Sequence, residues 1–77
     1  DYLQAANYYA KVAEEFPIAK SAPEMLFKAG EVMEKRAKNL DKAVEFYQAL
    51  ADKYPDHKKS KDAVKRADKL RKKMTEE

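Results

Sequence analysis

The sequence contains no cysteine and no tryptophan, and it has one glycine and one histidine among 77 residues. Without cysteine the chain can form neither disulfides nor thiolate metal sites. A single glycine excludes a glycine-rich phosphate-binding loop. His57 has no second histidine or cysteine to complete a metal site. The longest uncharged run, Tyr2 to Ala10, is too short for a membrane span or a signal sequence.

Side chains that could carry out catalysis are equally scarce. Ser21 and Ser60 stand where helices are expected to begin, so we interpret them as helix caps, and neither has a base partner suggested beside it. The acidic pairs Glu14–Glu15 and Glu76–Glu77 are adjacent in sequence and would point in different directions on a helix. We therefore predict that the protein is not an enzyme and binds no cofactor and no metal.

The residues that are abundant favour helices. Charged residues of alternating sign make up 40% of the chain, and with a single glycine this composition favours an all-helical solenoid over any sheet. Apolar and small residues recur at the three-and-four spacing of amphipathic helices on both sides of Lys38-Asn39. They are Met25, Leu26, Ala29, Gly30, Met33 and Ala37 before this break, and Leu40, Ala43, Val44, Tyr47, Leu50 and Tyr54 after it.

Gly30 is the only glycine, and it falls inside the first of these two helices. A glycine there costs roughly 1 kcal/mol relative to alanine. Such a cost requires a packing reason. We predict close approach of the second helix, with Ala43 or Tyr47 filling the space that a side chain would take.

The chain repeats itself. Residues 1–16 match residues 40–54 at an offset of 38, with Tyr9 on Tyr47 and Pro17 on Pro55, and residues 60–74 match the first helix at an offset of 37, with Ala67 on Gly30. We interpret residues 1–77 as one domain: residues 1–16 are the second helix of a truncated repeat, 22–55 a complete repeat, and 58–75 a closing helix or the first helix of a third repeat. A chain that opens on Asp1 inside a helical pattern suggests a piece of a longer protein.

Helix boundaries have their own signals. Ser21 followed by Glu24 predicts a capping box, and Asn39 is placed to cap the helix after it. Pro17 and Pro55 each predict a helix end, because proline disfavours the helical conformation of the residue before it.

Eight positions in register resemble the tetratricopeptide repeat family. They are Leu26, Ala29, Gly30 and Met33 in the first helix, and Ala43, Tyr47, Leu50 and Pro55 in and after the second. The sequence departs from the family in having Leu26 where tryptophan is frequent, Met33 where tyrosine is frequent, and one extra residue in the turn. The resemblance implies an all-α solenoid fragment of antiparallel helix-turn-helix units that acts as a scaffold and binds a peptide or partner protein on its concave face.

A narrower resemblance covers nearly the whole chain. Its motifs are Phe16-Pro17, Ser21, Pro23-Glu24, Leu26, Lys28, Gly30 and Lys53-Tyr54-Pro55-Asp56. Together with the 38-residue period, they resemble a bacterial cell-envelope branch of the family, which includes the periplasmic Tol–Pal coordinator proteins and the lipoprotein of the outer-membrane β-barrel assembly machine. This resemblance implies a scaffold in the periplasm or associated with the outer membrane.

The repeat resemblance also places the protein-binding residues, on the side of the first helix away from the Gly30 contact. These residues are Glu24, Phe27, Glu31, Glu34 and Lys35, with Lys61, Val64, Asp68, Arg71 and Lys72 as their counterparts on the last helix. Phe27 has two interpretations that the sequence leaves open. It is either an aromatic anchor in the groove or a core residue at the edge of the core, packed against Val64.

Charge is distributed unevenly. Residues 57–77 hold nine Lys or Arg against four Asp or Glu, a net +5, and residues 1–56 hold eight against ten, a net −2. Nucleic-acid binding is nevertheless an unlikely role, because no aromatic residue interleaves these lysines and Asp62 and Asp68 dilute their field. The plainer interpretation is a solvated closing helix. As an alternative function, residues 1–16 carry an apolar stripe through which two copies could pair.

Overall fold

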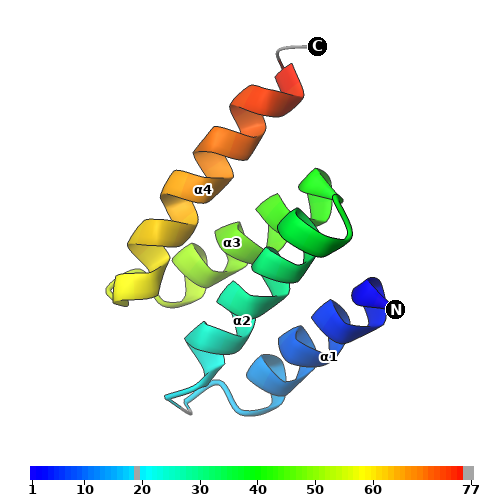
Figure 1. Cartoon of the computed structure of the whole chain (residues 1–77). Coiled ribbons are helices and arrows are strands. Elements are labelled where there is room, and N and C mark those ends of the chain that lie inside the picture. The colour runs from blue at the N-terminus through cyan, green and yellow to red at the C-terminus, as the bar shows by residue number, and fades with distance from the viewer. Residues whose placement is uncertain (19, 76–77) are drawn as a thin grey trace.

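The computed structural model describes residues 1–18 and 20–75, and within them the chain is helical with no strand. The helices are α1 (Tyr2–Glu15), α2 (Ala22–Glu31), α3 (Leu40–Lys53) and α4 (Lys58–Thr75), and a π-helical turn, η1 (Val32–Arg36), continues α2. Consecutive helices run antiparallel and pack side by side in chain order (Figure 1). The predicted all-α fold of antiparallel helix-turn-helix units is confirmed.

The ends of α1 and α3 are alike. Each helix is closed by an aromatic residue directly before a proline, Phe16 with φ −127° and ψ 63° and Tyr54 with φ −131° and ψ 62°. Neither residue has helical torsions, as expected because a following proline disfavours the helical conformation. The two predicted helix ends are confirmed, and the matching geometry indicates that α1 and α3 are equivalent elements 38 residues apart.

The predicted helix starts have mixed outcomes. Asn39 caps α3 as expected, since its Oδ1 accepts a hydrogen bond from the backbone N–H of Lys42 at 3.1 Å. Ser21 precedes α2 but makes no side-chain capping bond, so the predicted capping box with Glu24 is wrong. The reason is local: Ser21 already has helical torsions, φ −80° and ψ −11°, whereas a capping residue normally has an extended backbone.

Ser60 does not cap a helix either. It lies inside the first turns of α4, is 2% exposed, and its hydroxyl donates a hydrogen bond to the carbonyl oxygen of Tyr54, with the carbonyl oxygen of Leu50 3.4 Å away. Those carbonyls lie at the end of α3, and each also accepts a backbone hydrogen bond, Leu50 from the N–H of Tyr54 and Tyr54 from the N–H of His57. Ser60 therefore joins α4 to the end of α3.

The core lies along the seams between neighbouring helices. Tyr47 at its centre is fully buried, and a Cβ built on Gly30 would lie 2.4 Å from Tyr47 Cε1. The prediction that Gly30 marks a close helix crossing is confirmed, with Tyr47 as its partner. The buried apolar residues are Ala6, Ala13, Ala22, Leu26, Phe27, Ala29, Met33, Ala43, Tyr47, Leu50, Ala63, Ala67 and Leu70.

The extra residue of the turn is accommodated by η1. A π-helical turn contains one residue more than an α-helical turn, and here the backbone N–H of Ala37 donates to the carbonyl of Val32, five residues earlier, at 3.0 Å. Lys38 then takes a left-handed conformation with φ 58°, and the chain reverses into α3. The insertion therefore leaves the seam between Gly30 and Tyr47 undisturbed.

Candidate interaction groove between η1 and α4

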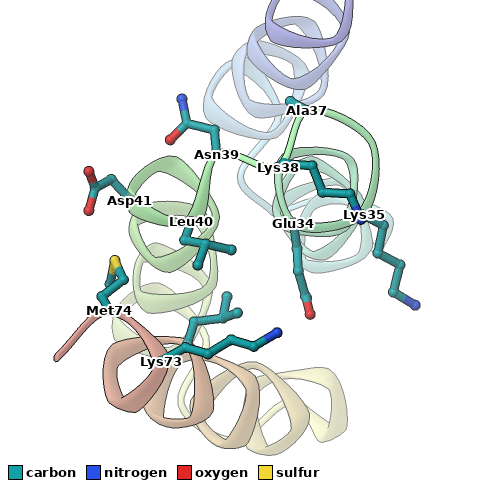
Figure 2. Close-up of a pocket in the computed structure, with 10 residues that line it drawn as sticks. Glu34, Lys35, Ala37, Lys38, Asn39, Leu40, Asp41, Lys73 and Met74 are labelled. Carbon is teal, nitrogen blue, oxygen red and sulfur yellow. The ribbon is translucent and has the colours of Figure 1, made fainter. Parts of the chain in front are cut away.

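An open groove of about 1020 Å³ lies where η1, the start of α3 and the end of α4 meet. Figure 2 shows Glu34 from η1 and Lys73 from α4 reaching into the space between the helices. Leu40 and Leu70 contribute to its apolar floor. The full lining is Glu34, Lys35, Ala37, Lys38, Asn39, Leu40, Asp41, Leu70, Lys73 and Met74.

A polar cluster joins α2, α3 and α4 beside this groove. The Tyr47 hydroxyl donates a hydrogen bond to Glu34 Oε1 at 2.8 Å and accepts one from Arg66 Nη1 at 3.3 Å. The same Arg66 nitrogen lies 3.2 Å from Glu31 Oε2. Both side chains of that ion pair are about one third exposed, so solvent screens it and its contribution to stability is modest. The cluster fixes the spacing of α4 from α2.

Burial raises the pKa of Tyr47 well above its ordinary value of 10.0. The hydrogen bond from Arg66 lowers this pKa and the Glu34 carboxylate raises it, but neither outweighs burial. For Arg66, burial lowers the pKa, and the interactions with Tyr47 and Glu31 more than offset this, so the pKa is raised overall. At neutral pH the cluster therefore holds a neutral phenol and a charged guanidinium.

Phe27, for which the sequence left two interpretations open, belongs to the core. It is 5% exposed, and its ring lies 5.6 Å from the Tyr47 ring between centroids. Two cations of α4 cover it, with Arg66 Cζ 4.7 Å and Lys59 Nζ 4.8 Å from the ring centroid. Val64, the expected neighbour, remains 41% exposed. Phe27 is thus unavailable as a groove anchor in this structure.

The register of α4 relative to α2 differs from the predicted one by one residue. Lys28 Nζ lies over the Tyr9 ring at 5.9 Å, and Arg66 Cζ lies over the Tyr47 ring at 6.0 Å. Arg66 lies 38 residues after Lys28, and Tyr47 lies 38 residues after Tyr9, so the two contacts are equivalent at an offset of 38. The offset of 37 is therefore wrong for α4. It matched Ala67 to Gly30 because both are small, whereas Ala67 corresponds to Ala29, which is also fully buried.

This correction moves the α4 half of the predicted binding set. One residue along a helix is a rotation of about 100°, so none of the five α4 residues corresponds to the α2 residue assigned to it, and of the five only Lys72 stays in the set, now as the counterpart of Glu34. The other four are Lys61, Val64, Asp68 and Arg71. Arg71 illustrates the displacement, since it pairs with Asp68 at 3.3 Å and donates to Gln48 Oε1 of α3 at 2.8 Å. The counterparts of Glu24, Phe27, Glu31, Glu34 and Lys35 become Asp62, Lys65, Lys69, Lys72 and Lys73.

The predicted binding residues on the α2 side do not all lie in one place. Glu34 and Lys35 line the groove, and Glu31 holds Arg66 at its side. Glu24 lies elsewhere, in a separate hollow of about 550 Å³ whose lining includes Pro17 and His57. None of these positions is thereby shown to bind a partner, and the binding role of the set stays a prediction.

Arg66 and Lys73 were missed by reasoning from the sequence. A usable signal existed for Arg66, because at the 38-residue offset that α1 and α3 already obey it falls on Lys28, as Tyr47 falls on Tyr9. Among the residues that the structure describes, no three His, Cys, Asp or Glu side chains gather as a metal site. No described helix is long and apolar enough to cross a membrane.

Comparison with known families identifies one repeat. The family model of the tetratricopeptide repeat matches residues 24–57, which include most of α2, all of η1 and α3, and the turn before α4. Repeats of this family are non-catalytic and mediate protein–protein interactions. No match was found among curated proteins or among solved structures.

Proposed function

We propose that this chain, which carries a tetratricopeptide repeat over residues 24–57, is a protein-interaction scaffold that binds a segment of a partner protein in the groove where η1, the start of α3 and the end of α4 meet. The observation that carries the proposal is the groove itself, with Leu40 and Leu70 in its floor and charged side chains around its rim. Apolar concavities with a few placed polar groups are the usual form of binding sites.

The chemistry of the groove supports binding rather than catalysis. No serine, cysteine or histidine lies among the described residues that line it, so it offers no nucleophile of those types and no imidazole base. Glu34 accepts a hydrogen bond from Tyr47 and so helps to hold the helices together. The groove therefore presents a shaped surface to a partner.

A substitution that fills the groove tests this proposal. Ala37 lines the groove and is partly exposed, so Ala37→Arg should occupy the space with little effect on folding. The probe is a peptide selected from a random library for binding to the full chain, with affinity measured by fluorescence anisotropy. We expect Ala37→Arg to weaken binding at least roughly tenfold, or about 1.4 kcal/mol, with an unchanged melting temperature.

Asn7→Arg provides the matched control, because it adds the same side chain at an exposed position of α1. This variant should bind the peptide as the wild type does. If Ala37→Arg binds equally well, or if both variants lose affinity to the same extent, the partner does not occupy the groove and the proposal fails.

We further propose that the scaffold works in the bacterial cell envelope, in the periplasm or at the outer membrane. Support comes from the sequence motifs alone, chiefly Phe16-Pro17, Pro23-Glu24 and Lys53-Tyr54-Pro55-Asp56. Fractionation of cells that express the parent protein tests this placement. Recovery of the parent in the cytoplasmic fraction would contradict it.

Self-association through α1 is a second candidate function, and a difference between equivalent helices favours it. Ala43, Tyr47 and Leu50 of α3 are fully buried, whereas their counterparts Ala5, Tyr9 and Val12 of α1 are only partly buried. Large apolar side chains on α1 are also exposed, including Tyr8 at 65%. An exposed apolar surface of this kind favours contact with a partner, and a second copy would provide one.

A further inference from the structure

We infer that the open face of α1 binds an amphipathic helix of a partner protein, one that carries a small residue followed by two acidic residues in the spacing found on α2. The open face consists of exposed or partly buried residues that recur every three or four positions: Tyr2, Ala5, Tyr9, Val12 and Phe16. It is separate from the groove, so the inference does not rest on the groove proposal. Its basis is the internal repeat, because α3 packs between α2 and α4, whereas the equivalent helix α1 packs mainly against α2 and η1 (Figure 1).

The covered side of α1 repeats a contact made by α3. Lys28 Nζ of α2 lies 5.9 Å from the centroid of the Tyr9 ring. Arg66 Cζ of α4 lies 6.0 Å from the centroid of the Tyr47 ring, with both partners 38 residues later in the chain. The two tyrosines are therefore equivalent, and the surroundings of Tyr47 predict what would complete the surroundings of Tyr9.

Helix α2 and the turn η1 supply the other half of the surroundings of Tyr47. Gly30 leaves room for the ring, because a Cβ at that position would overlap it. Glu34 accepts a hydrogen bond from the Tyr47 hydroxyl at 2.8 Å, and Glu31 pairs with Arg66 at 3.2 Å. The features that match the tyrosine and its cation are therefore a small residue and two acids, one and four positions after it.

Tyr9 and Lys28 lack these acidic partners. Within residues 1–18 and 20–75, no ion pair involves Lys28, and no hydrogen bond involves the Tyr9 hydroxyl. Lys28 is exposed and Tyr9 is only partly buried, whereas Tyr47 is fully buried. The open face thus offers a phenol and a cation beside its apolar stripe, and a helix with acids at these two positions is complementary to it.

Coverage of the apolar stripe adds a further requirement. Leu26 lies four positions before Gly30 and Met33 three positions after it, and both are buried. Residues at these spacings share one face of a helix. The partner helix that fits therefore has an apolar residue, a small residue, an acid, an apolar residue and an acid at positions equivalent to 26, 30, 31, 33 and 34.

A second copy paired through its own α1 fits this face less well. Residues 2–13 contain no acidic residue, so such a pairing brings no acid to the middle of α1, where Tyr9 lies beside Lys28. Self-association through α1 is therefore the weaker use of the face. A helix with the α2 spacing should displace a second copy.

A synthetic helix tests the inference. The probe is a fluorescent peptide with the sequence of residues 22–38, and its binding to the full chain is measured by anisotropy at low salt. Two comparison peptides each change one feature, Gly30→Leu at the small position, or Glu31→Gln with Glu34→Gln at the acids. We expect the Gly30→Leu peptide to bind at least roughly tenfold more weakly than the probe. The glutamine peptide should bind at least roughly threefold more weakly.

Three arginine variants of the protein locate the site. Ala5→Arg places a long charged side chain on the open face at a partly buried position, and it should weaken binding of the probe at least roughly tenfold. Asn7→Arg is the matched control, since Asn7 is exposed two residues away on the opposite side of α1. Asn7→Arg and the groove variant Ala37→Arg should both bind the probe as wild type does. The groove proposal and this inference can therefore fail independently.

A charge exchange tests the pairing of Lys28 with the partner. Lys28 is exposed, so Lys28→Glu should fold as wild type does. We expect this variant to bind the probe at least roughly threefold more weakly than wild type, and to bind a Glu31→Lys peptide more tightly than wild type binds it. Lys53→Glu makes the same charge change at an exposed position of α3, and it should change the affinity for either peptide by less than about twofold.

Contrary outcomes overturn the inference in distinct ways. Equal affinities of the probe and its two comparison peptides would show that neither the small residue nor the acids are recognised. Equal binding by Ala5→Arg and wild type would place the probe away from the open face. Absence of probe binding would also overturn the inference, and a wild-type dimer that Ala5→Arg disrupts would then assign the face to a second copy.

Discussion

At the scale of single residues, the contact between Gly30 and Tyr47 sets how closely α2 and α3 approach. The Tyr47 ring lies where a Cβ on Gly30 would be, with three ring carbons within 2.9 Å of that position. The ring cannot move aside easily, because Tyr47 is fully buried and its hydroxyl is bound to Glu34 and Arg66. The glycine is therefore required by packing, against its own helix propensity.

Gly30→Ala should accordingly destabilise the protein. Overpacking of a filled core costs about 1–3 kcal/mol, which outweighs the gain of about 1 kcal/mol in helix propensity. Urea unfolding followed by circular dichroism measures the free energy of unfolding. In a Tyr47→Leu background, where the ring is gone, Gly30→Ala should be neutral or stabilising. Equal losses in both backgrounds would contradict the packing explanation.

Tyr47 also predicts a pH dependence. Burial raises its pKa in the folded protein, while the unfolded value lies near 10. The neutral phenol is thus favoured by folding, so this contribution to stability is complete below pH 10 and is lost as the pH rises through 10 toward the folded value. Above pH 10, the free energy of unfolding of wild type should fall by up to about 1.4 kcal/mol per pH unit relative to that of Tyr47→Phe.

At pH 7, where the phenol is neutral, wild type should be the more stable of the two proteins. Tyr47→Phe should be about 1 kcal/mol less stable than wild type, because the hydrogen bonds to Glu34 and Arg66 are removed. Urea unfolding from pH 7 to pH 11 compares the two proteins. Tyr8→Phe is the control, since Tyr8 is 65% exposed, and it should follow wild type throughout. Parallel pH profiles of wild type and Tyr47→Phe would refute the role of the buried phenol.

The sequence could predict the Gly30 contact but not the place of Phe27. A lone glycine in a helix has one main physical cause, close approach, and the spacing of the second helix left Ala43 and Tyr47 as partners. Phe27 lies one residue from the core stripe, where a ring can turn inward or outward. The outcome depends on Lys59 and Arg66, which cover it from α4, and their reach is a tertiary property that spacing within α2 does not contain.

At the scale of elements, the two serines that were expected as caps do different work. Ser60 is buried and bonds to the carbonyl of Tyr54 at the end of α3, whereas Ser21 is exposed and makes no capping bond. Ser60→Ala should lower the free energy of unfolding by about 1 kcal/mol, because it removes a buried hydrogen bond that joins α4 to the end of α3. Ser21→Ala should change it by less than about 0.5 kcal/mol.

Thermal unfolding by differential scanning calorimetry distinguishes the two serine variants directly, because they delete the same hydroxyl group. A larger loss for Ser21→Ala than for Ser60→Ala would reverse the assignment. The sequence could not make this distinction. Both serines precede amphipathic segments, and the difference arises because the turn before α4 is tight enough to carry Ser60 under the end of α3.

The sequence could not fix the register of α4 relative to α2 either. Its buried face is a single stripe of small residues and one leucine, Ser60, Ala63, Ala67 and Leu70, which matches α2 at an offset of 37 or 38 almost equally well. The equivalent contacts of Lys28 and Arg66 on Tyr9 and Tyr47 decide for 38. At that offset Gly30 and Met33 correspond to Asp68 and Arg71, which are exposed. The side of α4 that corresponds to the α3-facing side of α2 is therefore polar, and it forms the outer side of α4.

At the scale of the whole molecule, the two ends of the helix row differ in character. The outer side of α4 is charged, whereas α1 exposes Tyr8 and Phe16 at 65% and 59%. Among the described residues, no element covers α1 in the way that α2 covers α3. The equivalent helix α3 shows the effect of such a cover, because Ala43 and Leu50, which correspond to Ala5 and Val12, are fully buried.

This asymmetry predicts self-association through α1 rather than through α4. Wild type should show a concentration-dependent mass in sedimentation equilibrium, because pairing of two α1 helices removes apolar surface from water. Tyr8→Lys with Phe16→Lys should yield a monomer at every concentration. Val64→Lys is the control, since Val64 is 41% exposed on α4, and this variant should associate as wild type does. A wild-type protein that remains monomeric at millimolar concentration would contradict the prediction. Association that persists in the α1 double variant and is lost in Val64→Lys would place the contact on α4 instead.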